Sequence, residues 1–481
     1  MSILAPLTWA LLTWADPPAP AHAPPLSPLA VVSALESALG NAIASAEPAV
    51  VAIAREKSEN HGETTAVRGR NPAPHQLDPR TLGNGAAAVV PGDDFLSFDY
   101  GSGVVIGEQG EILTAYHVVK GAARLVVRGA GRQGFEAEIL AADPRSDLAV
   151  IVPREAPGLA PPKLTPIALG DAQNLRKGSF LVALGNPFNT ARDGRPSASW
   201  GILSNIARRL EVSEEERRLH GLQLRNYPTL LQLDSKLNLG MSGGAVINLK
   251  GELVGVTTAA ASVAGFDAQA GYAIPMDRQG RRIVESLRQG KEYEYGFLGI
   301  GLDTKNGTSR VASAQVNSPA ALGKILVEDQ VLAVGGVPVS DADSLVLAIN
   351  SIPAGTKVTL KLLRQNEVIE REVELAKFRV DGEIIAANRP SPWRGLRVDY
   401  TSTLPQMTFN PETINALSPG GVVVTEVEPD SPAAEAGIKR DLVIKASEDQ
   451  KIKNPRDFAR AVAGRAGPVR LATDQGLITI K

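Results

Sequence analysis

The chain has 481 residues, a formal net charge of -2 and no cysteine. Its length allows roughly two to four domains, and an apolar fraction of 43% is enough for packed cores rather than wholesale disorder. The lack of cysteine excludes disulfides, thiolate metal sites and a cysteine nucleophile. The near-neutral charge, with no basic block, argues against nucleic acid or an anionic membrane surface as partner.

Residues 1–28 are predicted to form a signal peptide or leader. Residues 3–15 are apolar, and Ala-His-Ala at residues 21–23 offers a small-x-small cleavage site, as in secretory signal peptides. A basic segment before the apolar stretch is missing, because the first Lys or Arg is Arg55. A disordered, Pro-rich leader is therefore the alternative. The apolar stretch is too short for a membrane span, and no later stretch reaches ~18 uncharged apolar residues.

Hydrophobic periodicity predicts a mainly β first domain over residues 29–291. A short amphipathic helix is expected over residues 29–45, ended by Pro48 and followed by a buried strand. Residues 56–99 are polar and rich in Gly and Pro, which is typical of a functional or disordered loop. Short strands separated by Gly and Asp turns then indicate an all-β barrel or sandwich, closed by a helix over residues 276–291. The strands are expected at residues 104–106, 112–114, 124–127, 148–151, 181–184 and 253–256.

The chain after residue 295 contains a weak internal repeat. Ser-Pro-Ala-Ala at residues 318–321 recurs at residues 431–434. In both copies an apolar strand precedes this motif, an acidic residue follows it (Asp329 or Asp441), and a helix-like stretch comes later. The repeat predicts two related modules of about 85–100 residues, a usual size for a small domain. We place them at residues 295–378 and 390–481.

The segment Gly-Met-Ser-Gly-Gly at residues 240–244 is the first candidate for chemistry. Nucleophilic acyl transfer needs an activated hydroxyl, a base, a group that orients the base, and donors aimed at the developing oxyanion. Glycines around a serine permit a tight turn in which backbone amides can share one cavity. Ser242 is thus the candidate nucleophile, and the amides of Gly240 and Ser242 are the candidate oxyanion donors. An ordinary Gly/Ser turn is the alternative.

His117 and Asp147 are the candidate base and its orienting partner. Of the five histidines, His117 alone ends a buried strand, and Asp147 opens the apolar strand that follows it. Alone, a packed histidine or a solvated turn aspartate would be the usual interpretation. The order His, Asp, Ser is that of the chymotrypsin architecture and not of subtilisins or α/β-hydrolases. Asp171 and Asp234 are alternatives to Asp147, but neither opens an apolar strand after the histidine.

Together these motifs resemble the HtrA/Deg family of PDZ-containing serine proteases, over about residues 48–481. The resemblance implies a chymotrypsin-like double β-barrel protease domain followed by two PDZ-type α+β domains. It also implies an endopeptidase that degrades unfolded or damaged proteins in the cell envelope, homo-oligomers of three or more copies, no cofactor or metal, and a regulatory loop at residues 56–99. The residues that carry it are Gly101–Val105, Ile112–Thr114, His117–Val119, Asp147–Val150, Ala183–Phe188, Gln232, Asp234, Asn238 and Gly271–Pro275.

The chain departs from the family pattern around the serine. Met241 and Ala245 stand where the family usually has Asn and Pro, and Leu233 interrupts its Gln-Thr-Asp run. These departures weaken inferences about the activation loops. Lys236 lies where chymotrypsin-like folds often place the floor of the P1 pocket, and a cation there would favour acidic P1 residues. A lysine that points to solvent is the alternative.

The first repeat module resembles a PDZ domain at its start. PDZ domains add an extended C-terminus to a sheet edge and hold its carboxylate with backbone amides, so C-terminal peptides are expected partners. The second module offers a weaker match in the comparable place, where peptide binding and a role in assembly are both open. The expected carboxylate-binding loop is Tyr295-Gly296-Phe297-Leu298-Gly299, and its counterpart is Trp393-Arg394-Gly395-Leu396.

Two other functions are consistent with the same residues. The chain could be a non-catalytic PDZ scaffold or chaperone that uses a latent protease domain as a platform, although an intact triad disfavours this. It could also be a zymogen-like enzyme that stays silent until a peptide docks on the first PDZ module. The peptide orientation near Met241 decides the second case, and no motif reports it.

Overall fold

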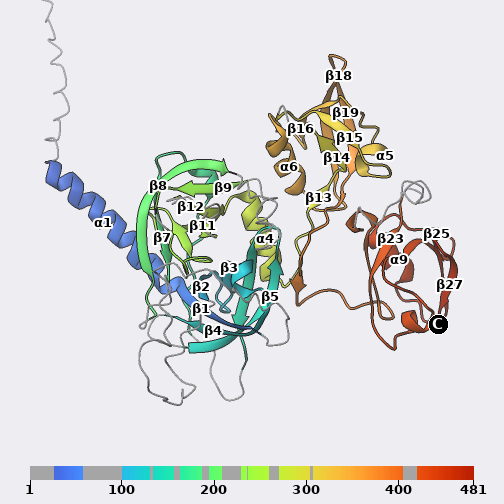
Figure 1. The fold of residues 1–481 in the computed structure, drawn as a ribbon, viewed down its shortest axis with the longest axis horizontal. Helices are drawn as coiled ribbons and strands as arrows, with labels where there is room; N and C mark the ends of the chain where they lie inside the picture. Colours follow the sequence, from blue (N-terminus) through green and yellow to red (C-terminus); the bar gives the residue numbers. More distant parts are fainter. Residues whose placement is uncertain are drawn as a thin grey trace, which may run out of the picture.

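The computed structural model describes most of the chain as helices, strands and their connections. The predicted leader up to residue 26, the predicted loop beyond residue 57 and Lys236 lie outside the described residues, as do Pro187 and Phe188 of the family motif. The described residues are 27–57, 100–129, 134–155, 163–186, 194–208, 229–235, 237–258, 270–303, 307–404 and 420–481. Figure 1 shows two barrels side by side, with α1 extending on one side and two smaller modules lying on the other.

The described chain begins with the predicted helix. α1 (Pro28–Ala46) starts where the Ser27 hydroxyl accepts the Ala30 amide and a proline occupies the first helical position. The segment Pro28–Ala49 is long and apolar enough to cross a membrane, a test that a signal sequence also passes. The sequence criterion of ~18 uncharged residues does not include this segment, because it contains Glu36 and Glu47.

The first barrel consists of six antiparallel strands. The order is β5-β4-β1-β2-β3-β6, and a β5–β6 pairing closes the ring. β5 also carries one short extra strand, β21 (Ile385–Ala386), from far along the chain. The six are β1 (Val50–Lys57), β2 (Tyr100–Val105), β3 (Ile112–Ala115), β4 (Ala122–Arg128), β5 (Gly134–Asp143) and β6 (Leu148–Pro153).

The second barrel is also closed and six-stranded, in the order β10-β11-β12-β9-β8-β7. A helix, α4 (Arg278–Arg288), follows it as predicted, and its buried face includes Ile283 and Leu287. The sequence left a barrel and a sandwich open, and the structure has two closed barrels, in agreement with the resemblance. The strands are β7 (Phe180–Gly185), β8 (Ser197–Arg208), β9 (Leu230–Leu233), β10 (Ala245–Ile247), β11 (Leu253–Thr257) and β12 (Gly271–Pro275).

Two α+β modules follow, each with its own hydrophobic core. The first contains β13 (Gly296–Phe297), β14 (Ile300–Leu302), β15 (Val311–Ala314), α5 (Pro319–Leu322), β16 (Gln330–Val334), β17 (Val337–Pro338), α6 (Ala342–Asn350), β18 (Lys357–Arg364), β19 (Glu367–Glu374) and β20 (Ala376–Lys377). The second contains β22 (Leu396–Tyr400), β23 (Val422–Val427), α8 (Pro432–Glu435), β24 (Val443–Ser447), β25 (Gln450–Lys451), α9 (Pro455–Val462), β26 (Val469–Thr473) and β27 (Gly476–Ile480).

The repeat seen in the sequence is a structural repeat. Ser318 and Ser431 cap α5 and α8 in the same way, each accepting the amide three residues on at 3.2 Å. The matched acidic residues need one correction. Asp441 has φ +70° and donates its amide to the preceding strand, and its counterpart by these criteria is Glu328 (φ +72°), not Asp329. The repeat spacing of 113 residues, from 318 to 431, also pairs Asp441 with Glu328, so matching one aspartate with another placed the counterpart one residue too late.

A buried lysine joins the modules to each other and to the barrels. The Lys377 ammonium lies 2.8 Å from Glu292, 2.7 Å from Asp399 and 3.8 Å from Glu294. Burial lowers the pKa of Lys377, but the three carboxylates outweigh it and the pKa lies above its usual value. Glu292 precedes the first module and Asp399 belongs to β22 of the second. One cation therefore helps fix the second module beside the first.

Replacing Lys377 with Met should loosen the second module. The change leaves Glu292 and Asp399 without their cation in a poorly solvated place, and removing one partner of a buried pair costs about 3–5 kcal/mol. We expect a larger radius of gyration by small-angle X-ray scattering. Lys357→Met is the control, because Lys357 and Glu372 form an exposed pair (68% and 64% of each side chain) that is worth little. Identical scattering from both variants would contradict this role of Lys377.

Candidate active site

The pairing of β3 with β6 brings His117 and Asp147 together. Ala115 at the end of β3 lies opposite Leu148 at the start of β6. Tyr116, the residue after Ala115, donates its amide to the Asp147 carbonyl at 2.8 Å. His117 follows within the short helix α2 (Tyr116–Val119). Residues just beyond a matched pair of antiparallel strands must meet at the same edge. The barrel register therefore places the imidazole against the carboxylate.

The contact between these two side chains has defined geometry. His117 Nδ1 lies 2.8 Å and 3.0 Å from the two carboxylate oxygens of Asp147. The same carboxylate accepts the His117 backbone amide at 3.0 Å and the Thr258 hydroxyl at 2.8 Å. An ionised carboxylate only accepts, so Nδ1 carries the proton and Nε2 is left as the acceptor. This is the tautomer that a general base acting through Nε2 requires.

The electrostatic surroundings of His117 favour its protonated form. Burial lowers the pKa of the imidazole, but the charge of Asp147 and its hydrogen bond raise it, and the net shift is upward from 6.5. Arg55, whose guanidinium donates to the His117 carbonyl at 3.1 Å, opposes this shift. The upward shift of the pKa makes the His117 imidazole a stronger base than a free one, which favours proton uptake by a general base.

Ser242 lies in the loop between β9 and β10, and that loop is anchored by its carbonyls. The Gly240 carbonyl accepts the Ser102 hydroxyl at 2.8 Å, and the Ser242 carbonyl accepts the Ser102 amide at 2.8 Å. The Met241 carbonyl accepts the Thr257 hydroxyl and the Gly244 amide. All three carbonyls therefore point into protein contacts.

Two amides of the same loop stay unused. Within the described residues, the amides of Met241, Gly243 and Gly244 all donate hydrogen bonds, whereas those of Gly240 and Ser242 donate none. These two are the amides that the sequence singled out as oxyanion donors. The Gly240–Met241 peptide has its carbonyl held by the Ser102 hydroxyl, whereas the Gly240 amide belongs to the preceding peptide.

Glycines bring the serine loop against the His117 segment. A Cβ on Gly101 would lie 2.6 Å from Val118 and 3.1 Å from the Ser242 carbonyl oxygen. Gly243 has φ +84°, and a Cβ there would lie 2.2 Å from the Ser102 carbonyl oxygen. No larger residue fits either position without movement of backbone. The loop of Ser242 thus packs directly on the strand and helix that position His117.

The first module presents an open loop at its start. Leu298 and Gly299 use their carbonyls to accept amides from Ala320 and Gln315, while their own amides make no hydrogen bond to any described residue. Gly299 has φ +79°, where a Cβ would lie 2.2 Å from Ser318. The adjacent strand β14 pairs on one edge only, with β15. Free amides beside an open strand edge are what capture of a peptide C-terminus needs.

The second module has the same loop, closed by an additional pair of backbone hydrogen bonds. Arg394 and Gly395 accept amides as Leu298 and Gly299 do, and Gly395 also has φ +79°. Here, however, Trp393 and Leu396 exchange two backbone hydrogen bonds of 3.1 Å and 2.9 Å. The Trp393 ring also packs edge-on against Phe458 of α9. The Leu396 amide is therefore already used, whereas the amides of Arg394 and Gly395, like those of Leu298 and Gly299, make no hydrogen bond to any described residue.

Comparisons with known proteins agree with this arrangement. A family model described as "Trypsin-like peptidase domain" matches residues 101–256, and one described as "PDZ domain" matches residues 296–375. The "Periplasmic serine endoprotease DegP" of Salmonella typhimurium is 30% identical over 388 residues, covering 78% of this chain and 74% of the relative. The chain belongs to the HtrA/DegP family of serine endoproteases. The resemblance and the mainly β, PDZ-bearing fold are confirmed.

Further members and structures of the family match over similar lengths. The "Periplasmic pH-dependent serine endoprotease DegQ" of Escherichia coli is 29% identical over 395 residues, covering 78% of each chain. A solved "HtrA-type protease AlgW with tripeptide" superposes with a TM-score of 0.51 at 23% identity, covering 73% of this chain and 98% of that one. At this identity the structural likeness supports the fold alone.

Asp171 and Asp234, the alternatives to Asp147, accept backbone amides of their own surroundings. Asp171 caps a short turn through the Gln173 amide, and Asp234 accepts the Ile202 amide. Met241, a departure from the HtrA/DegP pattern, is 2% exposed, and its sulfur accepts the Asn238 amide. Lys236, the candidate P1-pocket residue, is outside the described residues.

Two contributors to the site had no role in the sequence prediction. Ser102 and Thr258 are both almost fully buried and both donate a hydroxyl into the site. A buried hydroxyl needs a hydrogen-bond partner, so a hydroxyl residue in or beside an apolar strand indicates that such a partner exists. Which partner it finds depends on contacts between distant segments.

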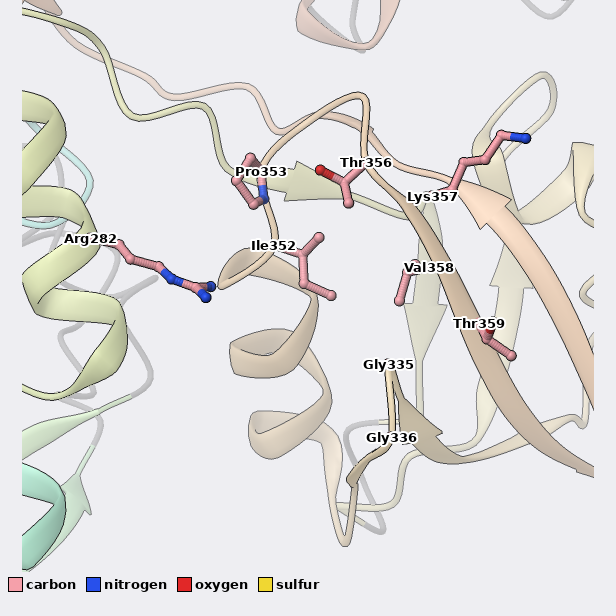
Figure 2. A pocket seen from close by; sticks show the side chains of 9 residues that line it. All are labelled: Arg282, Gly335, Gly336, Ile352, Pro353, Thr356, Lys357, Val358 and Thr359. Atoms are coloured by element: carbon pink, nitrogen blue, oxygen red, sulfur yellow. The ribbon is translucent and has the colours of Figure 1, made fainter.

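A pocket of about 630 Å³ lies away from this site, between α4 and the first module. Figure 2 shows Arg282 pointing from α4 towards the module, where it donates to the Ser351 carbonyl at 3.0 Å. Its lining includes Lys357 as a second cation but no carboxylate or imidazole. The pocket therefore offers no acid–base pair, and Arg282 instead braces the C-terminal end of α6.

The direction of the His117 pKa shift can be tested by NMR. In the native protein the His117 imidazole should titrate above 6.5, because the Asp147 carboxylate outweighs burial and Arg55. In Asp147→Asn only the lowering influences remain, so His117 should titrate below 6.5. A His117→Gln variant assigns the signal. A pKa that rises or stays unchanged in Asp147→Asn would refute this electrostatic picture.

Proposed function

We propose that this protein cleaves unfolded or damaged proteins in the cell envelope, with Ser242 as nucleophile, His117 as general base and then acid, and Asp147 as orienting carboxylate. The observation that carries the assignment is the His117–Asp147 contact at 2.8 Å beside a serine loop with two unused amides. Membership of a family whose named relatives are periplasmic endoproteases favours an enzyme over a scaffold.

The proposed reaction uses only side chains and backbone of this chain. His117 Nε2 takes the Ser242 proton as the hydroxyl oxygen attacks the scissile carbonyl. The amides of Gly240 and Ser242 then stabilise the oxyanion, and His117 returns the proton to the leaving amine. Water repeats the sequence on the acyl-enzyme. Asp147 remains ionised throughout and holds the imidazole in the required tautomer.

We propose the following domain boundaries: a leader at residues 1–28, the protease domain at 29–291, and PDZ domains at 295–378 and 390–481. The pairing of Ile385–Ala386 with β5 attaches the chain between the two PDZ domains to the protease domain. Homo-oligomers and C-terminal peptides as ligands are part of the same proposal. The open loop at Leu298–Gly299 supports the first PDZ domain as the peptide site, and the closed loop at Trp393 supports an architectural role for the second.

Hydrolysis of unfolded casein by residues 27–481 tests the reaction. Ser242→Ala should abolish both hydrolysis and labelling by a fluorophosphonate, because the nucleophilic oxygen is gone. Ser197→Ala removes an exposed serine of the same barrel and should behave as the native protein. Labelling that persists in Ser242→Ala would show that another residue is the nucleophile.

Calorimetric titration with C-terminal peptides tests the PDZ assignment. The native protein should bind a peptide with a free carboxylate and bind its amidated form at least about tenfold more weakly. Gly299→Ala should abolish binding, since its Cβ would lie 2.2 Å from Ser318 at a φ of +79°. Gly395→Ala introduces the same clash with Ser431 in the second module and should retain binding. The reverse pattern would assign the peptide site to the second module.

A further inference from the structure

The turn that presents Asp147 is built around a second, buried carboxylate. Asp143 accepts the Arg145 amide at 3.1 Å, and the Ser146 amide and hydroxyl at 3.2 and 2.6 Å. Asp147 at the end of this turn has φ +56°, a conformation that costs free energy for a residue with a side chain. The contacts of Asp143 therefore offset the strain that aims Asp147 at His117.

A fourth donor to Asp143 comes from outside the barrels. The Tyr295 hydroxyl donates to the Asp143 carboxylate, and Tyr295 is completely buried. Tyr295 is the first residue of the loop assigned to peptide carboxylates. Tyr295 thus belongs to the PDZ domain in sequence, while its hydroxyl contacts the turn that presents Asp147.

The far end of the first PDZ domain reaches the same turn. The buried Arg145 guanidinium lies 3.9 Å from the centre of the Phe378 ring and 5.1 Å from that of Tyr295. The Phe378 amide donates to the Tyr295 carbonyl at 2.8 Å, and its ring packs against that of Phe297. Residues from both ends of the first PDZ domain therefore pack around Arg145, which lies between Asp143 and Asp147 in the sequence.

We propose that Tyr295 is a positioning residue for Asp147, acting through Asp143. The inference rests on the proposed function, because it assumes that Asp147 orients His117. Without the tyrosine hydroxyl, the buried carboxylate loses a donor and the turn can relax away from its strained shape. His117 then loses its orienting partner for part of the time, whereas the Ser242 loop keeps its contacts with Ser102 and Thr257.

A matched pair of variants of the full chain separates this role from general packing. Tyr295→Phe removes the hydroxyl on Asp143. Tyr293→Phe removes the hydroxyl of the neighbouring ring, which lies 3.3 Å from the Ser351 carbonyl of the PDZ domain instead. The rings pack edge to face, with centroids 4.8 Å apart, and both variants keep that packing. The measurements are kcat and KM on casein, and the rate of fluorophosphonate labelling.

Tyr295→Phe should lower kcat about tenfold, as expected for a lost hydrogen bond to a charged group, and leave KM within about twofold. The labelling rate should fall in proportion. Tyr293→Phe should change each quantity less than about twofold. Phe378→Leu, which removes the ring over Arg145, should lower kcat in the same direction and covers the case in which Tyr295→Phe fails to fold.

Equal kcat in the two tyrosine variants, or an effect confined to KM, would overturn the inference. If the native protein labels normally and Tyr295→Phe labels equally fast, this inference fails while the proposed function stands. If the native protein is neither labelled nor active, the proposed function fails and this inference fails with it.

Discussion

The catalytic arrangement depends on one buried serine that belongs to neither the base nor the nucleophile. Ser102 lies in β2 of the first barrel, yet its amide and hydroxyl hold the carbonyls of Ser242 and Gly240 in the second. Its hydroxyl also accepts the Asn186 amide at 2.8 Å from the end of β7. Because the proposed base lies in one barrel and the proposed nucleophile in the other, their alignment depends on the interface between the barrels. Ser102, a residue of the first barrel that bonds the serine loop and the end of β7 in the second, helps to fix that interface.

The same constraint explains the glycines around it. Gly185 approaches Met241 so closely that a Cβ would lie 3.1 Å from its Cα, and Gly243 must pass beside the Ser102 carbonyl. These positions have no room for side chains because the two barrels meet backbone to backbone. The hydroxyls of Ser102, Thr114 and Thr257 satisfy the polar groups that this close approach buries. A polar and tightly packed seam therefore lies beside the apolar cluster that the two barrels share.

The sequence was sufficient for the parts of the site that are local in the chain. His117 and Asp147 were recognisable because each adjoins an apolar strand, and the order His, Asp, Ser selected the architecture. The repeat at Ser318 and Ser431 was recognisable because helix caps recur with their helices. The contacts of Ser102, Thr258 and Tyr295 were not, since each acts on a partner far along the chain. The closed loop at Trp393 could not be predicted either. It differs from the open loop by a pair of backbone hydrogen bonds, which both loop sequences allow.

The two PDZ domains show how one fold can serve two purposes. Both keep the capped short helix and the glycine at φ +79°, so the loop shape itself is not what separates them. The difference lies at the residue that precedes the two loop residues whose carbonyls accept amides. Phe297 packs on Phe378 beside Arg145, whereas Trp393 packs on Phe458 within its own domain. The loop of the first domain is thus tied to the aspartate turn of the protease domain through neighbouring aromatic rings. The loop of the second domain is tied to its own core, and that domain is held in position by Asp399 on Lys377.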